Sequence, residues 1–213
     1  ISDYRIVKGT AVYTSNFTPP TAPLTAITNT SLLTCNDTPN IYNASGIPNV
    51  ITLGGDAKSS TSVTKYANAS ILLDGSGDFL TIADGTNLDF GSEPFTMEGW
   101  YRADDVSGDR YIISAGGGTF NAGHFGVNFY NGSWRVGGFN DKLISGTTGI
   151  NTSTWHHFAW THNHRVIQFF VDGAKVGNTV DVSSDTFDCG GSFQIGGYPV
   201  SYTHLTLPTR LMV

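Results

Sequence analysis

The chain has 213 residues, of which 39% are hydrophobic, which is compatible with one all-β domain plus appendages or with one and a half smaller units. Only 13% of the residues are charged, which argues against long surface helices, because such helices are rich in Glu and Lys. The formal net charge of −6 argues against a nucleic-acid partner, which needs a basic footprint, and no apolar run approaches the roughly 20 residues that span a bilayer.

The N-terminal part of the chain is predicted to be an extended segment followed by a linker. Residues 1–13 form a predicted strand with a glycine turn, and residues 14–24 continue as an extended, proline-containing run. Residues 25–57 are linker-like, because Pro39, Pro48 and many hydroxyl side chains interrupt any regular alternation. We therefore interpret residues 25–57 as a linker.

A dense series of strand patterns fills residues 58–198. Apolar and polar residues alternate in short runs, each closed by Gly, Asn or Asp. Asn131-Gly132 and Asp172-Gly173 each separate two apolar-rich runs, which predicts hairpins, because a type I′ turn needs positive φ at both central residues. No part of this region sustains a 3.6-residue period. The sequence therefore predicts an all-β sandwich with almost no helix.

Two further features stand outside this pattern. Residues 199–213 lack its Gly and Asn punctuation and resemble translated adapter sequence, so we interpret them as a spurious tail and exclude them from functional reasoning. Cys35 and Cys189 fit no metal-ligand spacing such as C-x-x-C, and the sequence leaves open whether they pair.

Five runs, taken in order, resemble the laminin G-like branch of the concanavalin A-like lectin/glucanase superfamily, in particular the tandem units of phage tail-fibre and bacterial surface proteins. The runs are S-V-T-K-Y-A-N-A-S-I-L-L-D-G-S-G-D-F-L-T-I at 62–82, F-G-S-E-P-F-T-M-E-G-W-Y at 90–101, T-W-H-H-F-A-W-T at 154–161, F-F-V-D-G at 169–173 and F-Q-I-G-G at 193–197. The resemblance covers residues 58–198. It implies an antiparallel two-sheet jelly-roll sandwich, the concanavalin A-like fold.

Residues 1–24 resemble the closing strand and exit of such a unit, through the run R-I-x-K-G-x-A-x-Y-x-x-x-F-x-P-P. Because this run precedes the domain, we expect it to be the end of a preceding repeat. The closing strand expected after Gly197 is missing, and the first and last strands are neighbours in this fold. Residues 1–24 are therefore candidates to complete the sandwich edge, which would also protect that edge from aggregation.

Asp74 and Asp78 frame the turn D-G-S-G-D. The resemblance implies a Ca²⁺ site at this turn, and a third acid such as Asp3 would add to the six to eight oxygens that Ca²⁺ requires. The alternative is that Asp74 forms an Asx-turn and Asp78 caps a hairpin. The sequence leaves both interpretations open.

A candidate ligand site surrounds the turn at residues 131–132. Trp134 follows this turn, and an aromatic platform beside amide and acidic groups is a common way to hold a sugar ring. The predicted ligand-binding residues are Asn128, Tyr130, Trp134, Arg135 and Asp141. The alternative for Trp134 is an ordinary, half-buried strand tryptophan.

The histidines of one predicted hairpin suggest a zinc site. His156, His157, His162 and His164 lie close together in sequence, and His162 and His164 share one face of a strand. The resemblance, however, implies a structural role for His157, so zinc is the weaker interpretation.

The resemblance implies a non-catalytic carbohydrate-binding or adhesion module of a phage tail fibre or bacterial surface protein, located on a virion or cell surface. The implied partner is a glycan or cell-surface polysaccharide. Further implied partners, within the parent protein, are neighbouring repeats or the other copies of a homotrimer. One alternative is a purely structural spacer domain. Another is a glycoside hydrolase, which is disfavoured because neither Glu93 nor Glu98 lies in the E-x-D-x-x-E run of such enzymes.

Overall fold

The computed structural model describes residues 1–35, 41–47, 49–66, 69–82, 88–116, 125–138, 143–190 and 193–198. This part of the chain forms fifteen strands and contains no helix that is long and apolar enough to cross a membrane. The strands are β1 (Ser2–Lys8), β2 (Thr30–Thr34), β3 (Ile51–Gly54), β4 (Lys58–Ser60), β5 (Ser70–Leu72), β6 (Phe79–Ile82), β7 (Phe95–Tyr101), β8 (Asp109–Ala115), β9 (Phe125–Tyr130), β10 (Ser133–Gly138), β11 (Leu143–Gly146), β12 (His156–Asn163), β13 (Val166–Val171), β14 (Ala174–Asp181) and β15 (Phe193–Ile195).

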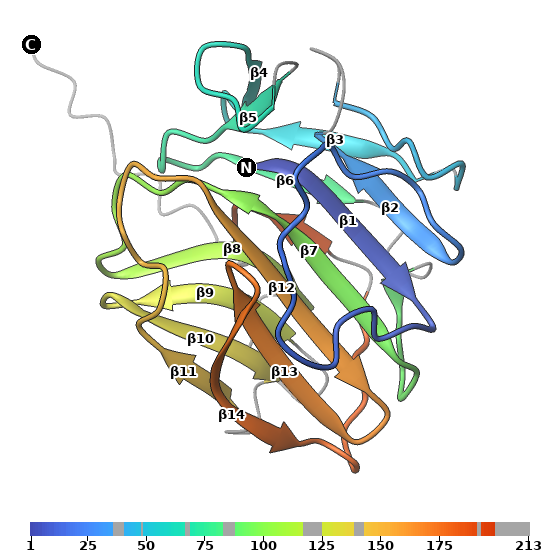
Figure 1. The fold of residues 1–213 in the computed structure, drawn as a ribbon. Helices are drawn as coiled ribbons and strands as arrows, with labels where there is room; N and C mark the ends of the chain where they lie inside the picture. Colours follow the sequence, from blue (N-terminus) through green and yellow to red (C-terminus); the bar gives the residue numbers. More distant parts are fainter. Residues whose placement is uncertain are drawn as a thin grey trace, which may run out of the picture.

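Two antiparallel sheets lie face to face (Figure 1). The six-stranded sheet has the order β14-β13-β12-β7-β1-β2, and the seven-stranded sheet has the order β11-β10-β9-β8-β15-β6-β3. The short strands β4 and β5 pair separately. The predicted all-β, two-sheet sandwich is confirmed.

The Asn-Gly and Asp-Gly pairs form the hairpin turns that the sequence predicts. Asn131 and Gly132, with φ of 49° and 77°, join β9 to β10. Asp172 and Gly173, with φ of 50° and 77°, join β13 to β14. Positive φ at both central positions gives the turn a twist that matches the twist of the flanking strands.

A continuous apolar core fills the space between the sheets, because alternate residues of each strand turn inward. Aromatic rings dominate it; the ring centroid of Phe95 lies 5.1 Å from that of Trp160 and 5.3 Å from that of Phe187. The largest fully buried side chains are Trp134, Trp160, Tyr4, Phe90, Phe95, Phe125, Phe129, Phe158, Phe169, Phe170, Phe187 and Phe193.

The N-terminal segment is part of the sandwich. β1 lies inside the six-stranded sheet, where Arg5 pairs with Glu98 of β7 on one side and Leu33 of β2 on the other. Residues 9–25, which we call the strap, then cross the outer face of this sheet (Figure 1). The Phe17 N–H donates to the Gly173 carbonyl at 3.0 Å. That this segment comes from a preceding repeat stays a prediction.

Residues 25–57, interpreted from composition as a linker, contribute a strand to each sheet. β2 extends the six-stranded sheet beyond β1, and β3 extends the seven-stranded sheet beyond β6. Leu32 and Leu33 are both buried. Short apolar runs inside a turn-rich segment are sufficient to form these strands, although the average composition hides them.

Both cysteines are buried and free. Burial raises the pKa of the Cys35 thiol to about 11 and also raises that of Cys189. Both thiols therefore stay protonated and behave as small core side chains.

Candidate functional site

β9 and β10 carry most of the residues for which the sequence predicts ligand binding, and strand alternation divides these residues between two faces. Across the two-residue turn, Tyr130 pairs with Ser133 and Phe129 pairs with Trp134. Trp134 therefore shares the inward face with Phe129, while Tyr130 and Arg135 belong to the outward face.

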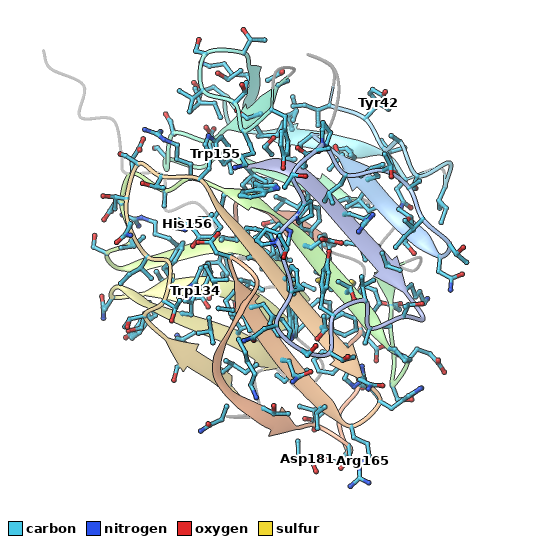
Figure 2. All side chains as sticks on the ribbon, in the orientation of Figure 1. Tyr42, Trp134, Trp155, His156, Arg165 and Asp181 are labelled. Atoms are coloured by element: carbon cyan, nitrogen blue, oxygen red, sulfur yellow. The ribbon has the colours of Figure 1, made fainter. Side chains whose placement is uncertain are left out.

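The expectation that Trp134 offers its ring to a ligand is corrected by its position in the core (Figure 2). The residue is 0% exposed, and its Nε1 donates to the Thr148 carbonyl at 2.9 Å. Its ring centroid lies 4.1 Å from that of Phe129 and 4.8 Å from that of Phe169. Trp134 has a packing role, because the short turn fixes the register and thereby the face.

The outer face of β8, β9 and β10 brings together a group that we call the tyrosine–arginine cluster. Its members are Asp109, Tyr111, Asn128, Tyr130, Arg135 and Tyr198. Tyr130 is 47% exposed, and the Arg135 guanidinium lies 4.9 Å from the centroid of its ring. Asn128 donates from Nδ2 to Oδ1 of Asp109. Three of the predicted ligand residues thus lie on one surface.

Tyr111 adds a second aromatic group on the β8 side of the cluster. Its ring stacks on that of Tyr198, with centroids 4.8 Å apart, and its hydroxyl donates to Asp109 Oδ2 at 3.5 Å. Burial is the main cause that raises the pKa of Tyr111, and the Asp109 carboxylate is the second, so the hydroxyl stays protonated. Asp141, the remaining residue predicted for this site, lies outside the described residues.

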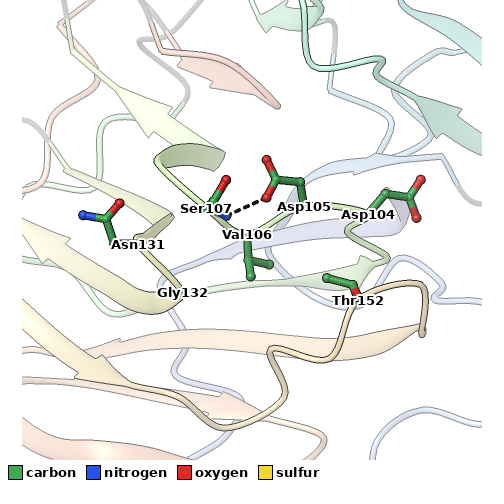
Figure 3. Close-up of a pocket in the computed structure, with 7 residues that line it drawn as sticks. All are labelled: Asp104, Asp105, Val106, Ser107, Asn131, Gly132 and Thr152. Atoms are coloured by element: carbon green, nitrogen blue, oxygen red, sulfur yellow. Dashed lines mark hydrogen bonds between the residues drawn. The ribbon is translucent and has the colours of Figure 1, made fainter.

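A hollow of about 410 Å³, which we call the loop hollow, adjoins the cluster (Figure 3). It is lined by Asp104, Asp105, Val106, Ser107, Asn131, Gly132 and Thr152. The Asn131 N–H donates to the Gly108 carbonyl at 2.8 Å, and the Gly132 N–H donates to the Val106 carbonyl at 2.9 Å. These bonds attach the β9–β10 turn to the β7–β8 loop and keep the hollow next to Tyr130.

The carboxylates of the loop hollow already have cationic partners. Asp105 accepts from the Ser107 N–H at 2.8 Å and lies 2.7 Å from Arg110 Nη2. These contacts, the bond from the Ser107 backbone above all, lower the pKa of Asp105 to about 2. Asp104 lies 3.1 Å from Arg102 Nη1. The hollow therefore presents amides, hydroxyls and compensated carboxylates, which suit a polar ligand without a large positive charge.

The acids predicted to hold Ca²⁺ lie elsewhere, before β6. The carboxylate oxygens of Asp56, Asp74 and Asp78 lie within 4.8 Å of one another. Asp78 accepts the backbone N–H groups of Asp56 and Asp74, each at 2.8 Å, and these bonds, that of Asp74 first, lower its pKa. Asp74 Oδ1 accepts the Ser76 N–H at 2.7 Å, as in an Asx-turn. A Ca²⁺ site at Asp74 and Asp78 stays a prediction, and Asp56 is an acid beside them that the sequence did not single out.

Asp3 does not join these acids, which corrects its predicted role as a third calcium ligand. The residue is 1% exposed, and its Oδ1 accepts the Leu24 N–H at 3.1 Å. Burial raises the pKa of Asp3 to about 7. A carboxyl group in such an environment is stabilised in its neutral form, whereas Ca²⁺ binds carboxylates.

The sequence itself matches a family with this architecture. The model of the concanavalin A-like lectin/glucanases superfamily matches residues 74–206, more than half of the chain. The chain belongs to this superfamily. The resemblance stated above is thereby confirmed at the level of the concanavalin A-like superfamily, and the tandem tail-fibre setting stays a prediction.

Solved structures share the concanavalin A-like sandwich at low sequence identity. The binding domain of Paraclostridial Mosquitocidal Protein 1 is 15% identical with a TM-score of 0.58, over 76% of this chain and 43% of that chain. The receptor binding domain of botulinum neurotoxin D is 14% identical with a TM-score of 0.57, over 74% of this chain and 41% of that chain. The chain thus spans less than half the length of these structures, and the similarity shows the fold. No curated protein matches the sequence.

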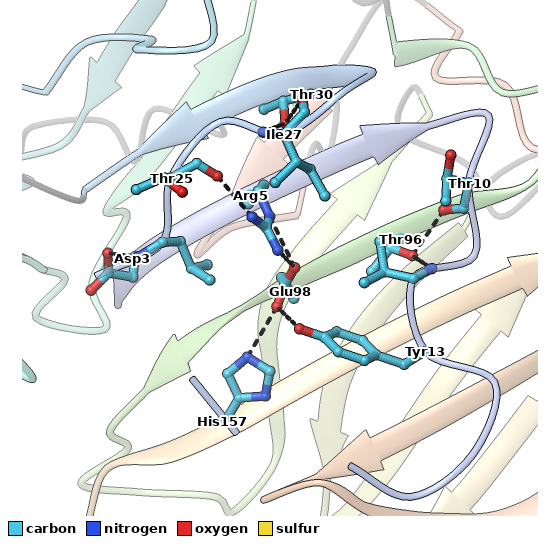
Figure 4. A network of polar contacts seen from close by, with 12 residues as sticks. Asp3, Arg5, Thr10, Tyr13, Thr25, Ile27, Thr30, Thr96, Glu98 and His157 are labelled. Carbon is cyan, nitrogen blue, oxygen red and sulfur yellow. Dashed lines mark hydrogen bonds and ion pairs between the residues drawn. The ribbon is translucent and has the colours of Figure 1, made fainter. Parts of the chain in front are cut away.

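The superfamily includes glucanases as well as lectins, so the buried acid of the six-stranded sheet is of interest. Glu98 is 0% exposed beneath the strap (Figure 4). Its Oε1 accepts from Arg5 Nη2 at 2.5 Å, and its Oε2 accepts from the Tyr13 hydroxyl at 2.9 Å and lies 3.3 Å from His157 Nε2. Burial acts to raise the pKa of Glu98, but His157 and Arg5 together lower it. This enclosed carboxylate joins the strap to the sheet.

The other histidines have separate partners. His156 Nδ1 lies 2.6 Å from Asp172 Oδ2, and His162 Nδ1 lies 2.8 Å from the Glu93 carbonyl. Burial lowers the pKa of His162, which favours the neutral ring. Within the described ranges, the histidines do not converge on a shared metal-binding position.

Sequence reasoning missed Asp109, Tyr111 and the acids of the loop hollow. They lie about twenty residues before Asn128 in sequence, and only the pairing of β8 with β9, which places Asp109 opposite Tyr130, brings them to the site. The run D-D-V-S-G-D at 104–109 does carry the polar turn residues of a loop. That run was the available signal.

Proposed function

We propose that the chain is a non-catalytic carbohydrate-binding or adhesion module that holds a glycan at the tyrosine–arginine cluster and the adjoining loop hollow. The observation that carries this proposal is the exposed ring of Tyr130, which lies beside the Arg135 guanidinium and directly before Asn131 of the hollow. An aromatic face, a fork of donors and amide groups therefore meet on one surface.

The chemistry of this surface suits a ligand with many hydroxyl groups. The apolar face of a pyranose can pack on the Tyr130 ring, while the ring edge and hydroxyl groups stay available for polar contacts. Asp109 is an acceptor, and Asn128 offers both an acceptor and a donor group. Asn128 and Asp109 already bond to each other, so a sugar hydroxyl would bind a remaining lone pair of the Asp109 carboxylate or of the Asn128 amide oxygen, and no polar group would be left buried and unpaired.

The relatives support the proposal at the level of class. The superfamily is described by its lectins and glucanases, and both solved structures reported above are named as binding domains. The setting in a phage tail fibre or bacterial surface protein, on a virion or cell surface, is supported by the tandem-unit resemblance of residues 58–198. Host or environmental polysaccharide is the partner proposed for that setting, and neighbouring repeats or a homotrimer are the proposed assembly.

A glycan array probed with the full chain, with and without Ca²⁺, tests the proposal. We expect binding to at least one glycan and a loss of about tenfold or more in Tyr130→Ala, as for an aromatic anchor of an interface. Tyr42→Ala is the matched control, because Tyr42 is 48% exposed but lies on the other side of the molecule from β10 (Figure 2).

Each outcome of the array has a structural meaning. Binding that requires Ca²⁺ would bring Asp56, Asp74 and Asp78 into the site. Binding that Tyr130→Ala leaves unchanged would place the glycan on another surface. An array without any bound glycan would contradict the proposal and favour a structural spacer domain.

A further inference from the structure

Arg135 differs from the arginines beside it because no carboxylate of the described ranges forms an ion pair with it. Arg110 lies 2.7 Å from Asp105, and Arg102 lies 3.1 Å from Asp104. The Arg135 guanidinium instead lies over the ring of Tyr130. With respect to the described residues, the donors of this guanidinium are available for an anionic group of a ligand.

The ring of Tyr130 is the contact that the structure gives this guanidinium. The distance of 4.9 Å between the guanidinium carbon and the ring centroid is that of a cation–π contact. The planar fork of N–H donors in a guanidinium matches the two oxygens of a carboxylate. The Arg135 side chain is also partly buried, so part of its conformational entropy is already lost before a ligand binds.

Hydrogen-bond acceptors for hydroxyl groups lie across the sheet from Arg135. Arg135 of β10 pairs with Asn128 of β9, which in turn pairs with Tyr111 of β8, so the three residues form one row. Asp109 lies beside this row on β8, roughly 10 Å from β10, since adjacent strands are about 4.8 Å apart. A ligand that reaches both positions needs an anionic group at one end and hydroxyl groups at the other.

We propose that the tyrosine–arginine cluster selects a carboxylated sugar, such as a uronic or sialic acid, whose carboxylate binds Arg135 and whose ring packs on Tyr130. This inference rests on the proposed glycan-binding function and specifies its ligand class. The chain carries a net charge of −6, which repels anions at long range. The preference for acidic sugars therefore comes from the Arg135 contact and not from the general field of the protein.

The test uses the full chain on an array in which each acidic glycan is printed beside its uncharged counterpart. Suitable pairs are trigalacturonate with its methyl ester and sialyllactose with lactose. We expect at least one acidic member to bind about tenfold more tightly than its partner, as a charge-assisted hydrogen bond contributes. Arg135→Ala and Arg135→Gln should both bring this ratio close to one, and Arg135→Lys should keep part of it.

Lys175→Ala is the matched control. It removes one positive charge from β14, whose Lys175 side chain is exposed and donates to Thr179, and it should leave the ratio unchanged. Melting temperatures of all variants show whether each is folded.

The outcomes separate this inference from the proposed function. Equal binding of acidic and neutral partners, with loss of both in Tyr130→Ala, would overturn the carboxylate assignment and leave glycan binding intact. A preference for the acidic partner that persists in Arg135→Ala and Arg135→Gln would also overturn it. If no glycan on the array binds, both proposals fail.

Discussion

Asp3 and Glu98 are both buried carboxyl groups, yet their surroundings shift their pKa values in opposite directions. Asp3 has backbone and hydroxyl partners but no cationic partner in the described part of the chain, and burial raises its pKa to about 7. Glu98 has Arg5 and His157 beside it, and its pKa is lowered in spite of its burial. The difference shows that the partner, rather than burial alone, determines which form of a buried acid is stable.

For Asp3 we expect the free energy of unfolding to depend on pH. The pKa of Asp3 rises from 3.8 to about 7 on folding. At pH values between these two, the native state therefore holds a proton that the unfolded state has lost. The free energy of unfolding should therefore fall as the pH rises from about 4 to about 7. Asp3→Asn keeps the acceptor for Leu24 and tolerates the φ of 48° at this position. Urea denaturation from pH 4 to pH 8 should show a smaller slope and higher stability at pH 8 in the variant; an unchanged slope would contradict this account.

For Glu98 we expect the opposite dependence of stability on pH, and a larger change in the free energy of unfolding on substitution. Glu98→Gln leaves Arg5 buried without an anion, which should lower the free energy of unfolding by about 3 to 5 kcal/mol at pH 7. Since the pKa of Glu98 is lowered on folding, the wild-type advantage should shrink as the pH falls below 4.5, its value in an unfolded chain. Denaturant titrations at pH 7 and pH 3 measure both effects. Asp105→Asn, which breaks an exposed ion pair, is the control and should change stability little.

At the scale of elements, local signals predict the turns and the strand alternation well. The Asn-Gly and Asp-Gly hairpins follow directly from the left-handed backbone that these residues tolerate. The same signal could have placed Trp134, because a two-residue turn after Tyr130 sets Trp134 opposite Phe129. Its inward position was therefore available from the sequence. The positions of Asp109 and Tyr111 could not be predicted in this way, because their proximity to Asn128 depends on a strand pairing that no local motif specifies.

The strap gives an element-scale prediction at the Asp172-Gly173 turn. A Cβ on Gly173 would collide with the backbone carbonyl of Phe17, and the φ of 77° disfavours any side chain. Gly173→Ala should lower the free energy of unfolding by about 2 to 4 kcal/mol and make the strap more sensitive to proteolysis. Gly75→Ala is the matched control, because Gly75 has a φ of 86° and a Cβ at this position would meet no atom within 4 Å. Equal effects of the two substitutions would show that the strap contact contributes nothing.

At the scale of the whole molecule, the sandwich class was predictable but the place of its first strand was not. Composition, turn spacing and the family resemblance all indicate two antiparallel sheets. The position of β1 between β7 and β2 depends instead on pairing between residues such as Arg5 and Glu98, which lie 93 positions apart in the sequence. Contacts of this range give a high contact order, so refolding should be slow, in the range of milliseconds to seconds.

The same topology predicts a global effect of a small deletion. In the order β7-β1-β2, removal of β1 takes away two hydrogen-bonded ladders and leaves β2 without a partner in its sheet. We expect a chain without residues 1–8 to lack a cooperative unfolding transition and the near-ultraviolet circular dichroism of packed aromatic rings. A shortened chain that keeps both would show that β7 and β2 can pair without β1.

The alternation of buried and outward residues along β10 has a consequence for the evolution of such a domain. Trp134 and Val136 are fully buried, whereas Arg135 between them faces outward in contact with Tyr130. If the outward residues bind a ligand as proposed, single substitutions there would change the ligand preference while the inward positions keep the sandwich intact. A lineage built on this strand would then acquire new partners one residue at a time, without loss of the folded state.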